Sequence, residues 1–144
     1  MAKWPTVQLA DCVSLLAGFP FKSQHFTQKP EDVALVKGEN VSQGCILWDI
    51  SKHWSASDWE AMKKFQLLPG DVIVAMDRPW IPAGLKWAFS RKGDPKALLV
   101  QRCARLRSSN GRLDQRFLRW VIAGPDFENY VRPITTGVNV PHIS

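Results

Sequence analysis

The stretch of sequence that decides the fold is LPGDVIVAM, residues 68–76. Its first four letters are typical of a tight turn, because proline fixes its own backbone angle and glycine adopts conformations that other residues avoid. The five apolar residues that follow are rich in β-branched side chains and indicate a strand. We expect Asp71 to close the turn where this strand begins. A central strand entered through a tight turn is therefore the starting point of the predicted fold.

Short elements surround this strand in an irregular order. Apolar runs predict strands at about residues 7–9, 13–17, 33–36, 45–48, 85–89 and 98–106. Helices are predicted at about residues 58–65, opened by the capping pair Ser57 and Glu60, from Asp114 to Ile122, and after Asp126. No regular strand–helix–strand repeat is present in the sequence. It therefore predicts an α+β (mixed α/β) fold, with short mixed or antiparallel strands in a curved sheet and several short helices.

Length and composition fit one domain. The chain has 144 residues, of which 45% are hydrophobic and 22% charged, and we assign residues 1–144 to a single domain. No run of about 18 apolar residues occurs and the start lacks a signal-peptide layout, which predicts a cytoplasmic protein without membrane contact. Cys12, Cys45 and Cys103 have neither disulfide-framework nor zinc-ligand spacing. We expect reduced thiols and no metal.

Positive charge is concentrated in the second half of the chain. Residues 1–77 carry seven lysines and nine acidic residues, whereas residues 78–132 carry twelve basic and four acidic residues. Every arginine lies at or after Arg78. The planar guanidinium of arginine suits phosphates and guanine edges. This half therefore predicts a surface that binds a polyanion, with an ordinary solvated charged face as the alternative.

Motifs of catalysis are missing from the sequence. It contains no P-loop or dinucleotide-binding glycine motif, no Gly-x-Ser-x-Gly elbow, and neither of the motifs that mark a DNA methyltransferase. Asp71 and Asp77 bracket the central strand, but no Glu-x-Lys follows them to complete a nuclease metal site. We therefore predict a non-catalytic protein that uses no cofactor.

Residues 77–96, DRPWIPAGLKWAFSRKGDPK, are the segment most suited to contact a ligand. Two prolines and a glycine near its start predict a rigid, protruding loop, and its ends carry basic and aromatic side chains. A rigid loop suits insertion into a DNA groove because little conformational entropy is lost on binding. A stable turn in which Arg78 pairs with Asp77 or a backbone carbonyl explains the segment equally well.

The chain has an unusually large share of tryptophan, with seven residues. Four fall in apolar patterns and are expected in the core: Trp4, Trp59, Trp87 and Trp120. The other three, Trp48, Trp54 and Trp80, lie beside polar segments, where an exposed ring could stack on a base. Packing against the protein is the favoured interpretation for each of them.

Six stretches in order along the chain resemble the target-recognition domain of Type I restriction-modification specificity subunits. They are WPTVQLAD (4–11), GFPFKS (18–23), VKGENV (36–41), LPGDVIVAMDR (68–78), LLVQRCARL (98–106) and TGVNVPHIS (136–144). Each stretch alone is a weak signal, but the six together cover essentially the whole chain in the right order.

The resemblance implies sequence-specific binding of double-stranded DNA, chiefly in the major groove, at one half of a bipartite target. It also implies three kinds of partner: a methyltransferase subunit, a restriction (motor) subunit, and a second recognition domain joined through a long spacer helix. That helix and the second domain are expected to lie outside these 144 residues. The alternatives are a basic module that binds protein or RNA and, less favoured, a small metal-dependent nuclease.

Because the reading residues of this family vary among its members, the resemblance does not transfer them. The candidates for DNA binding rest on expected loop position and side-chain chemistry alone, since Arg and Lys read guanine and Asn and Gln read adenine. They are Lys22, Gln24, His25, Lys37, Asn40, Arg78, Trp80, Lys86, Arg91 and Lys92.

Overall fold

Four strands form an antiparallel sheet at the centre of the computed structural model, which describes residues 3–144. In spatial order they are β1 (Val13–Ala17), β9 (Cys103–Ser108), β4 (Val72–Ala75) and β7 (Trp87–Phe89). A second sheet contains β3 (His53–Trp54), β2 (Val33–Val36) and β8 (Ala97–Leu99), with β2 parallel to β8 and antiparallel to β3. The strands β5 (Trp80–Ile81) and β6 (Gly84–Leu85) form a separate hairpin.

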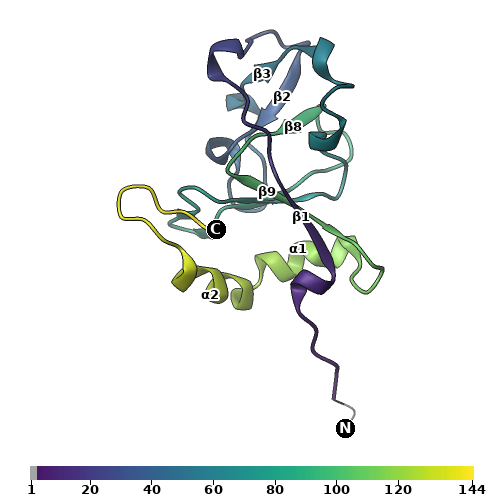
Figure 1. Cartoon of the computed structure of the whole chain (residues 1–144), viewed down its shortest axis with the longest axis vertical. Helices are drawn as coiled ribbons and strands as arrows, with labels where there is room; N and C mark the ends of the chain where they lie inside the picture. The colour runs from purple at the N-terminus through teal and green to yellow at the C-terminus, as the bar shows by residue number, and fades with distance from the viewer. Residues whose placement is uncertain (1–2) are drawn as a thin grey trace.

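Helical structure is short and falls mostly in the connections. Six 3-10 turns lie at Leu9–Asp11, Ser23–His25, Gly38–Asn40, Trp48–Ile50, Ala56–Asp58 and Lys63–Phe65. Two α-helices follow late in the chain, α1 (Gln115–Ala123) and α2 (Pro125–Ile134). The two helices lie below the central sheet in Figure 1, and the three-stranded sheet lies at the opposite end. Mixed strands with separate helices confirm the predicted α+β class.

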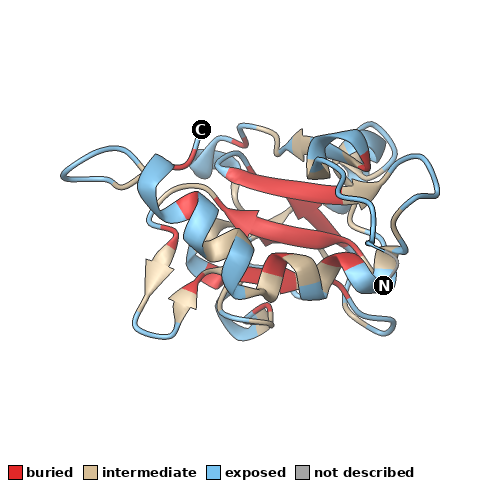
Figure 2. Ribbon diagram, turned by 90° about the horizontal axis from the view of Figure 1, so that it is seen from below, coloured by how far each residue is buried: buried red, intermediate tan, exposed pale blue. Residues whose placement is uncertain are grey.

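The apolar run of β4 is explained by burial on both of its faces. Ile73 and Ala75 pack with the residues of β2 and β8 in one core cluster. Val72 and Val74 face the other way and pack with Leu118 of α1 and other residues of the two helices. Figure 2 shows these buried strands crossing the middle of the molecule, with exposed helices and loops around them. A strand that is buried on both faces has a continuously apolar sequence instead of alternating apolar and polar residues.

The single long strand predicted at 98–106 is wrong, because the chain breaks in its middle. Arg102 adopts a positive φ of 67°, which no regular strand allows. The residues before it form β8 in the three-stranded sheet, and those after it form β9 in the central sheet. This short corner joins the two sheets.

Several other local predictions are corrected by the structure. The expected helix at 58–65 consists of two 3-10 turns linked by non-helical turns, and Ser55 rather than Ser57 caps the first of them. The expected strand at 7–9 is not a strand, and a 3-10 turn starts at Leu9. The expected strand at 45–48 is an isolated bridge at Ile46 followed by a 3-10 turn from Trp48, and the one expected at 85–89 is divided between β6 and β7. Trp4 and Trp120 are 90% and 59% exposed rather than in the core, because Trp4 precedes the first element and Trp120 lies on the outer face of α1.

Candidate nucleic-acid interface

Three of the predicted DNA-binding cations lie close together. Lys37 follows β2, Arg78 follows β4, and Lys86 lies between β6 and β7. Burial lowers the pKa of Lys86, and the neighbouring charge of Arg78 acts in the same direction. The carboxylate of Glu39 opposes this shift, and it also pairs with Lys37 at 3.0 Å. We call Lys37, Arg78 and Lys86 the strand-end cluster.

The C-terminal segment folds back and holds the chain at the end of β4. The amide of Arg78 donates to Pro141 O, and the amide of Ile143 donates to Met76 O, both at 2.7 Å. Between these bonds the carboxylate of Asp77 pairs with His142. Arg78 itself adopts a positive φ of 47°, a strained conformation that this double attachment maintains. We call residues 141–143, bound to residues 76–78, the C-terminal clasp.

Asp77 binds Arg102 and His142, so the predicted pairing of Asp77 with Arg78 is wrong. The side chain of Arg78 is exposed, and within residues 3–144 it forms no ion pair. Burial acts to raise the pKa of Asp77, but hydrogen bonds from Arg102 and His142 outweigh burial and lower the pKa below its ordinary value of 3.8. Asp77 of the clasp thus pairs with Arg102, whereas the side chain of Arg78 stays available to a ligand.

Because the folded-state pKa of Asp77 is lowered, its carboxylate stabilises the fold above pH 3.8, and this contribution is lost as the pH falls through the lower folded value. Asp77→Asn is therefore expected to cost about 1 kcal/mol of unfolding free energy at pH 6. The difference between the two proteins should shrink well below pH 3.8. Urea unfolding followed by tryptophan fluorescence at several pH values measures this. Asp49→Asn, at an exposed site, is the control; an equally pH-dependent difference there would contradict the assignment.

The hairpin β5–β6 packs against α2 instead of protruding freely. The indole of Trp80 donates to Thr135 Oγ1 at 3.2 Å, and the guanidinium of Arg132 lies 4.2 Å from its ring centre. Pro79 is fully buried. The predicted rigidity is explained by this packing, and the side chain of Trp80 is occupied by the protein itself.

Asn40 is buried, with only 1% of its surface exposed. Its amide nitrogen donates to Leu35 O at 3.1 Å and to Ser51 Oγ at 2.8 Å, and its carbonyl oxygen accepts from Lys37 N at 2.7 Å. All of these contacts hold the turn after β2 in place. Asn40 therefore has a structural role in this fold and is not placed to meet a ligand.

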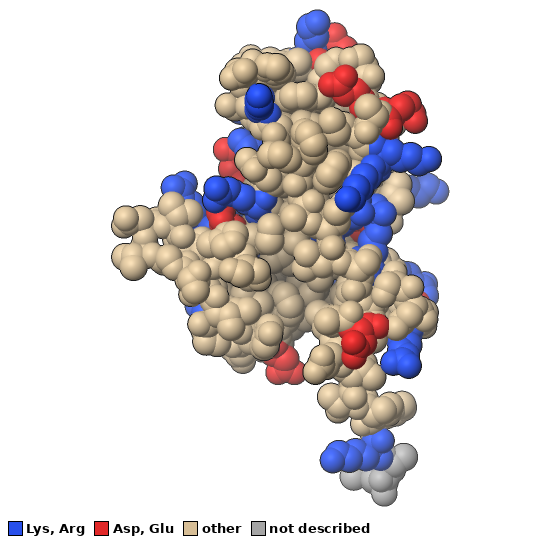
Figure 3. Space-filling view, in the orientation of Figure 1, with Lys and Arg blue, Asp and Glu red and all other residues tan. Residues whose placement is uncertain are grey.

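The remaining candidates lie in two other regions. Lys22, Gln24 and His25 are exposed around the turn Ser23–His25, and the ring of His25 stacks on Trp54 with centroids 6.0 Å apart. Arg91 and Lys92 are exposed on the turn between β7 and β8. In Figure 3, lysine and arginine atoms gather near the middle of the molecule on opposite edges of the face in view.

Several arginines of the basic half are engaged in the fold. Arg107 donates to both carboxylate oxygens of Asp71, and Arg105 donates to the carbonyls of Lys64 and Gln66. Burial lowers the pKa of Arg105, and the neighbouring charge of Arg107 adds to this effect. Such contacts are long-range, so the sequence could not separate these structural arginines from free ones.

The sequence prediction missed two cations of α1, Arg116 and Arg119. They lie three positions apart, so they share one face of the helix. Together with Arg91 and Lys92 they line a cavity of about 430 Å³. The sequence signal that could have indicated these two arginines is their three-residue spacing within the helix expected from Asp114 to Ile122.

Residues 3–144 contain no group of three His, Cys, Asp or Glu side chains placed to hold a metal ion. The three cysteines are free thiols; Cys12 and Cys103 are buried and Cys45 is partly buried, and burial raises the pKa of Cys103 to about 12. Among the same residues, no helix is long and apolar enough to cross a membrane.

Comparison with known proteins gives a consistent result. No protein-family model matches the chain. It is 29% identical over 141 residues to the Type I restriction enzyme EcoAI specificity subunit of Escherichia coli, covering 98% of this chain and 23% of that subunit. It is 26% identical over 140 residues to the MjaVIII specificity subunit of Methanocaldococcus jannaschii, covering 97% of this chain and 32% of that subunit. The chain thus spans a quarter to a third of the curated relatives it matches.

Solved structures share the fold at low sequence identity. The HsdS subunit from Thermoanaerobacter tengcongensis matches 99% of this chain and 34% of its own, with a TM-score of 0.62 and 14% identity. The Type I restriction-modification S subunit from M. genitalium matches 93% of this chain and 29% of its own, with a TM-score of 0.59 and 12% identity.

Both curated relatives are specificity subunits of Type I restriction enzymes, and the solved structures share the fold. The resemblance of this chain to a target-recognition domain of such subunits, predicted from the sequence, is confirmed.

Proposed function

We propose that this chain is a target-recognition domain that binds double-stranded DNA and reads one half of a bipartite target. The observation that carries the proposal is the match of 97–98% of the chain to Type I specificity subunits. In the whole protein, a second recognition domain would read the other half. The methyltransferase and restriction subunits would act on the DNA that the two domains select, so the chain itself contributes binding rather than catalysis.

Recognition would divide between phosphates and base edges. Exposed cations set the register on the backbone and supply affinity that depends on salt. The proposed DNA-contacting side chains are Lys22, Gln24, His25, Lys37, Arg78, Lys86, Arg91 and Lys92. Trp80 and Asn40 would act indirectly, because their packing fixes the loops that carry these side chains.

Selection from a library of random DNA duplexes tests this function. A DNA-reading domain is expected to enrich one short sequence, with an affinity that falls linearly in the logarithm of salt concentration. Competition by duplex RNA at equal concentration should be weak, and incubation with Mg²⁺ or Mn²⁺ should leave the DNA intact. Stronger competition by RNA, or metal-dependent cleavage, would contradict the proposal in favour of an RNA-binding module or a nuclease.

Arg78→Ala is expected to change the selected sequence, because Arg78 is the exposed cation of the strand-end cluster and forms no ion pair within residues 3–144. A bidentate contact of arginine with guanine contributes about 1–3 kcal/mol of discrimination, so preference at one base pair should fall by at least a factor of about five. Arg112→Ala removes an exposed arginine from the loop before α1 and serves as the control. If both variants select the wild-type sequence with wild-type affinity, Arg78 does not read a base.

A further inference from the structure

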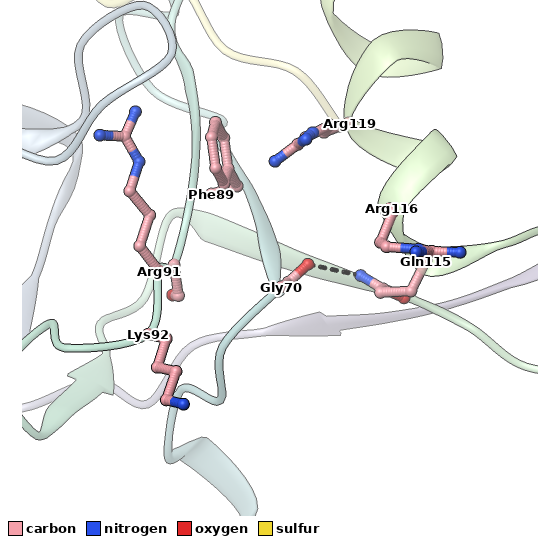
Figure 4. A pocket seen from close by; sticks show the side chains of 8 residues that line it. Gly70, Phe89, Arg91, Lys92, Gln115, Arg116 and Arg119 are labelled. Atoms are coloured by element: carbon pink, nitrogen blue, oxygen red, sulfur yellow. Dashed lines mark hydrogen bonds between the residues drawn. The ribbon is translucent and has the colours of Figure 1, made fainter.

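A cavity between the turn after β7 and the first half of α1 has properties that reading bases does not explain. Arg91 and Lys92 line it from the turn, and Arg116 and Arg119 line it from the helix. Its lining includes no acidic side chain. Figure 4 shows these residues around the cavity, with Phe89 between the two sides. Four basic side chains thus surround one hollow, and one of them, Arg116, also pairs with Asp114 at 3.0 Å.

Phe89 holds two of these arginines in place. The guanidinium of Arg91 lies 4.8 Å from the centre of the Phe89 ring, and that of Arg119 lies 4.7 Å from it. In Figure 4 the two guanidinium groups lie on opposite sides of the ring. Attraction between a cation and an aromatic face partly offsets the repulsion between like charges, and it orders the side chains before a ligand arrives.

Two buried polar atoms at this wall lack partners. Ser90 is 6% exposed, and its hydroxyl Oγ makes no hydrogen bond. The Nε of Arg119 is also buried and unpaired. Across residues 3–144 these are the two buried side-chain nitrogen or oxygen atoms without a partner, and both residues line the same cavity. Unpaired buried polar groups are unfavourable, and each of these two groups carries a proton that can be donated to an oxygen anion.

The surrounding backbone is fixed. Gly70 N donates to Ser90 O at 2.8 Å, and Gln115 Nε2 donates to Gly70 O at 2.7 Å, which ties the turn, the start of β4 and α1 together. On the far side of the turn, Arg91 N donates to a carboxylate oxygen of Asp94 at 2.7 Å. The site is therefore preorganised, which reduces the entropy that a ligand must overcome.

We propose that this cavity binds a backbone phosphate of duplex DNA and anchors the domain independently of base sequence. The proposal rests on the function proposed above and adds Ser90, Arg116 and Arg119 to the DNA-contacting residues. Arginine forks match the paired oxygens of a phosphodiester. The volume of about 430 Å³ is in the range that holds a small organic ligand, so the sugar next to the phosphate can enter with it.

The test measures affinity for the selected duplex and for a random duplex at several salt concentrations. Lys92→Gln and Arg119→Gln are each expected to lower the affinity of the protein for both duplexes by the same factor, about tenfold. The slope of log affinity against log salt should fall in magnitude by about 0.9 for each lost phosphate contact. Arg116→Gln changes a side chain that is 88% exposed and whose ion pair with Asp114 lies at the surface, so little loss of stability is expected. Thermal melting verifies the fold of this variant and of Arg119→Gln.

Lys29→Gln removes the same charge from an exposed position outside the cavity and should leave the slope unchanged. If the three cavity variants keep the wild-type slope while the wild type still selects a DNA sequence, the phosphate site is wrong and the proposed function stands. If inorganic phosphate shifts the NMR signals of Ser90 and Arg119 while the variants keep wild-type DNA affinity, the site takes a free anion, which also overturns the proposal. A wild type that selects no DNA sequence contradicts the proposed function instead.

Discussion

Asp71→Ala is expected to lower the free energy of unfolding by about 3 kcal/mol, because it breaks a buried ion pair and a turn together. Asp71 is 3% exposed and accepts hydrogen bonds from Arg107 Nε at 2.5 Å and Arg107 Nη2 at 2.8 Å. It also accepts from Leu68 N at 2.7 Å, which closes the turn before β4. Without the carboxylate, a guanidinium and an amide lose their partners in a largely desolvated place. Differential scanning calorimetry should show a melting temperature lower by about 10 °C.

Asp114→Ala is the matched control for this substitution. Asp114 also pairs with an arginine, Arg116, and also accepts a backbone hydrogen bond, but its side chain is 52% exposed. Loss of such an exposed helix cap is expected to destabilise the fold by less than loss of the buried pair, and the exposed ion pair adds little. If the two substitutions lower the melting temperature equally, the large loss of stability expected for Asp71→Ala is not due to the burial of Asp71.

Gly18→Ala is expected to destabilise the fold by about 3 kcal/mol or to prevent folding. A Cβ at position 18 would lie 2.1 Å from the carbonyl oxygen of Val100 and 2.7 Å from that of Leu99. These atoms belong to backbone that the neighbouring residues hold in place, since Phe19 N donates to Leu99 O and Val100 N donates to Val36 O, both at 3.0 Å. The segment that contains Gly18 cannot move away from Leu99 and Val100 without breaking these hydrogen bonds.

Gly38→Ala provides the comparison. A Cβ there meets only Asp77 O, at 3.7 Å, which is an ordinary contact, and Gly38 does not require a positive φ. The change should be neutral or stabilising by up to about 1 kcal/mol, because alanine restricts the unfolded chain. Guanidinium unfolding of both variants measures the difference. Equal stabilities would contradict the close approach of residue 18 to the corner between the sheets.

Local signals in the sequence predict the parts of the fold that depend on local interactions. The apolar run after the 68–71 turn becomes β4, and Asp71 closes that turn as expected. Asp114 caps α1 by accepting from Arg116 N, and the helix ends at Gly124, ahead of Pro125. In each case the turn or cap residue stabilises its neighbours along the chain, so the pattern is visible without tertiary information.

Features that depend on distant contacts could not be predicted. The break at Arg102 is set by two sheets that meet there, and Asp77 finds its partners at positions 102 and 142 rather than beside it. Burial of Asn40 likewise follows from a contact with Ser51. The sequence therefore indicated candidate cations by their chemistry and expected loop position, but which of them have partners inside the fold could be seen only in the structure.

Methylation-site mapping of a chimera tests the central claim most directly. In this chimera, residues 1–144 replace one recognition domain of a complete Type I specificity subunit, which is assembled with its methyltransferase. If this chain reads DNA, one half of the bipartite target should change to a new sequence while the other half stays as in the parent. A chimera that assembles and still methylates the unchanged parental target would contradict the account.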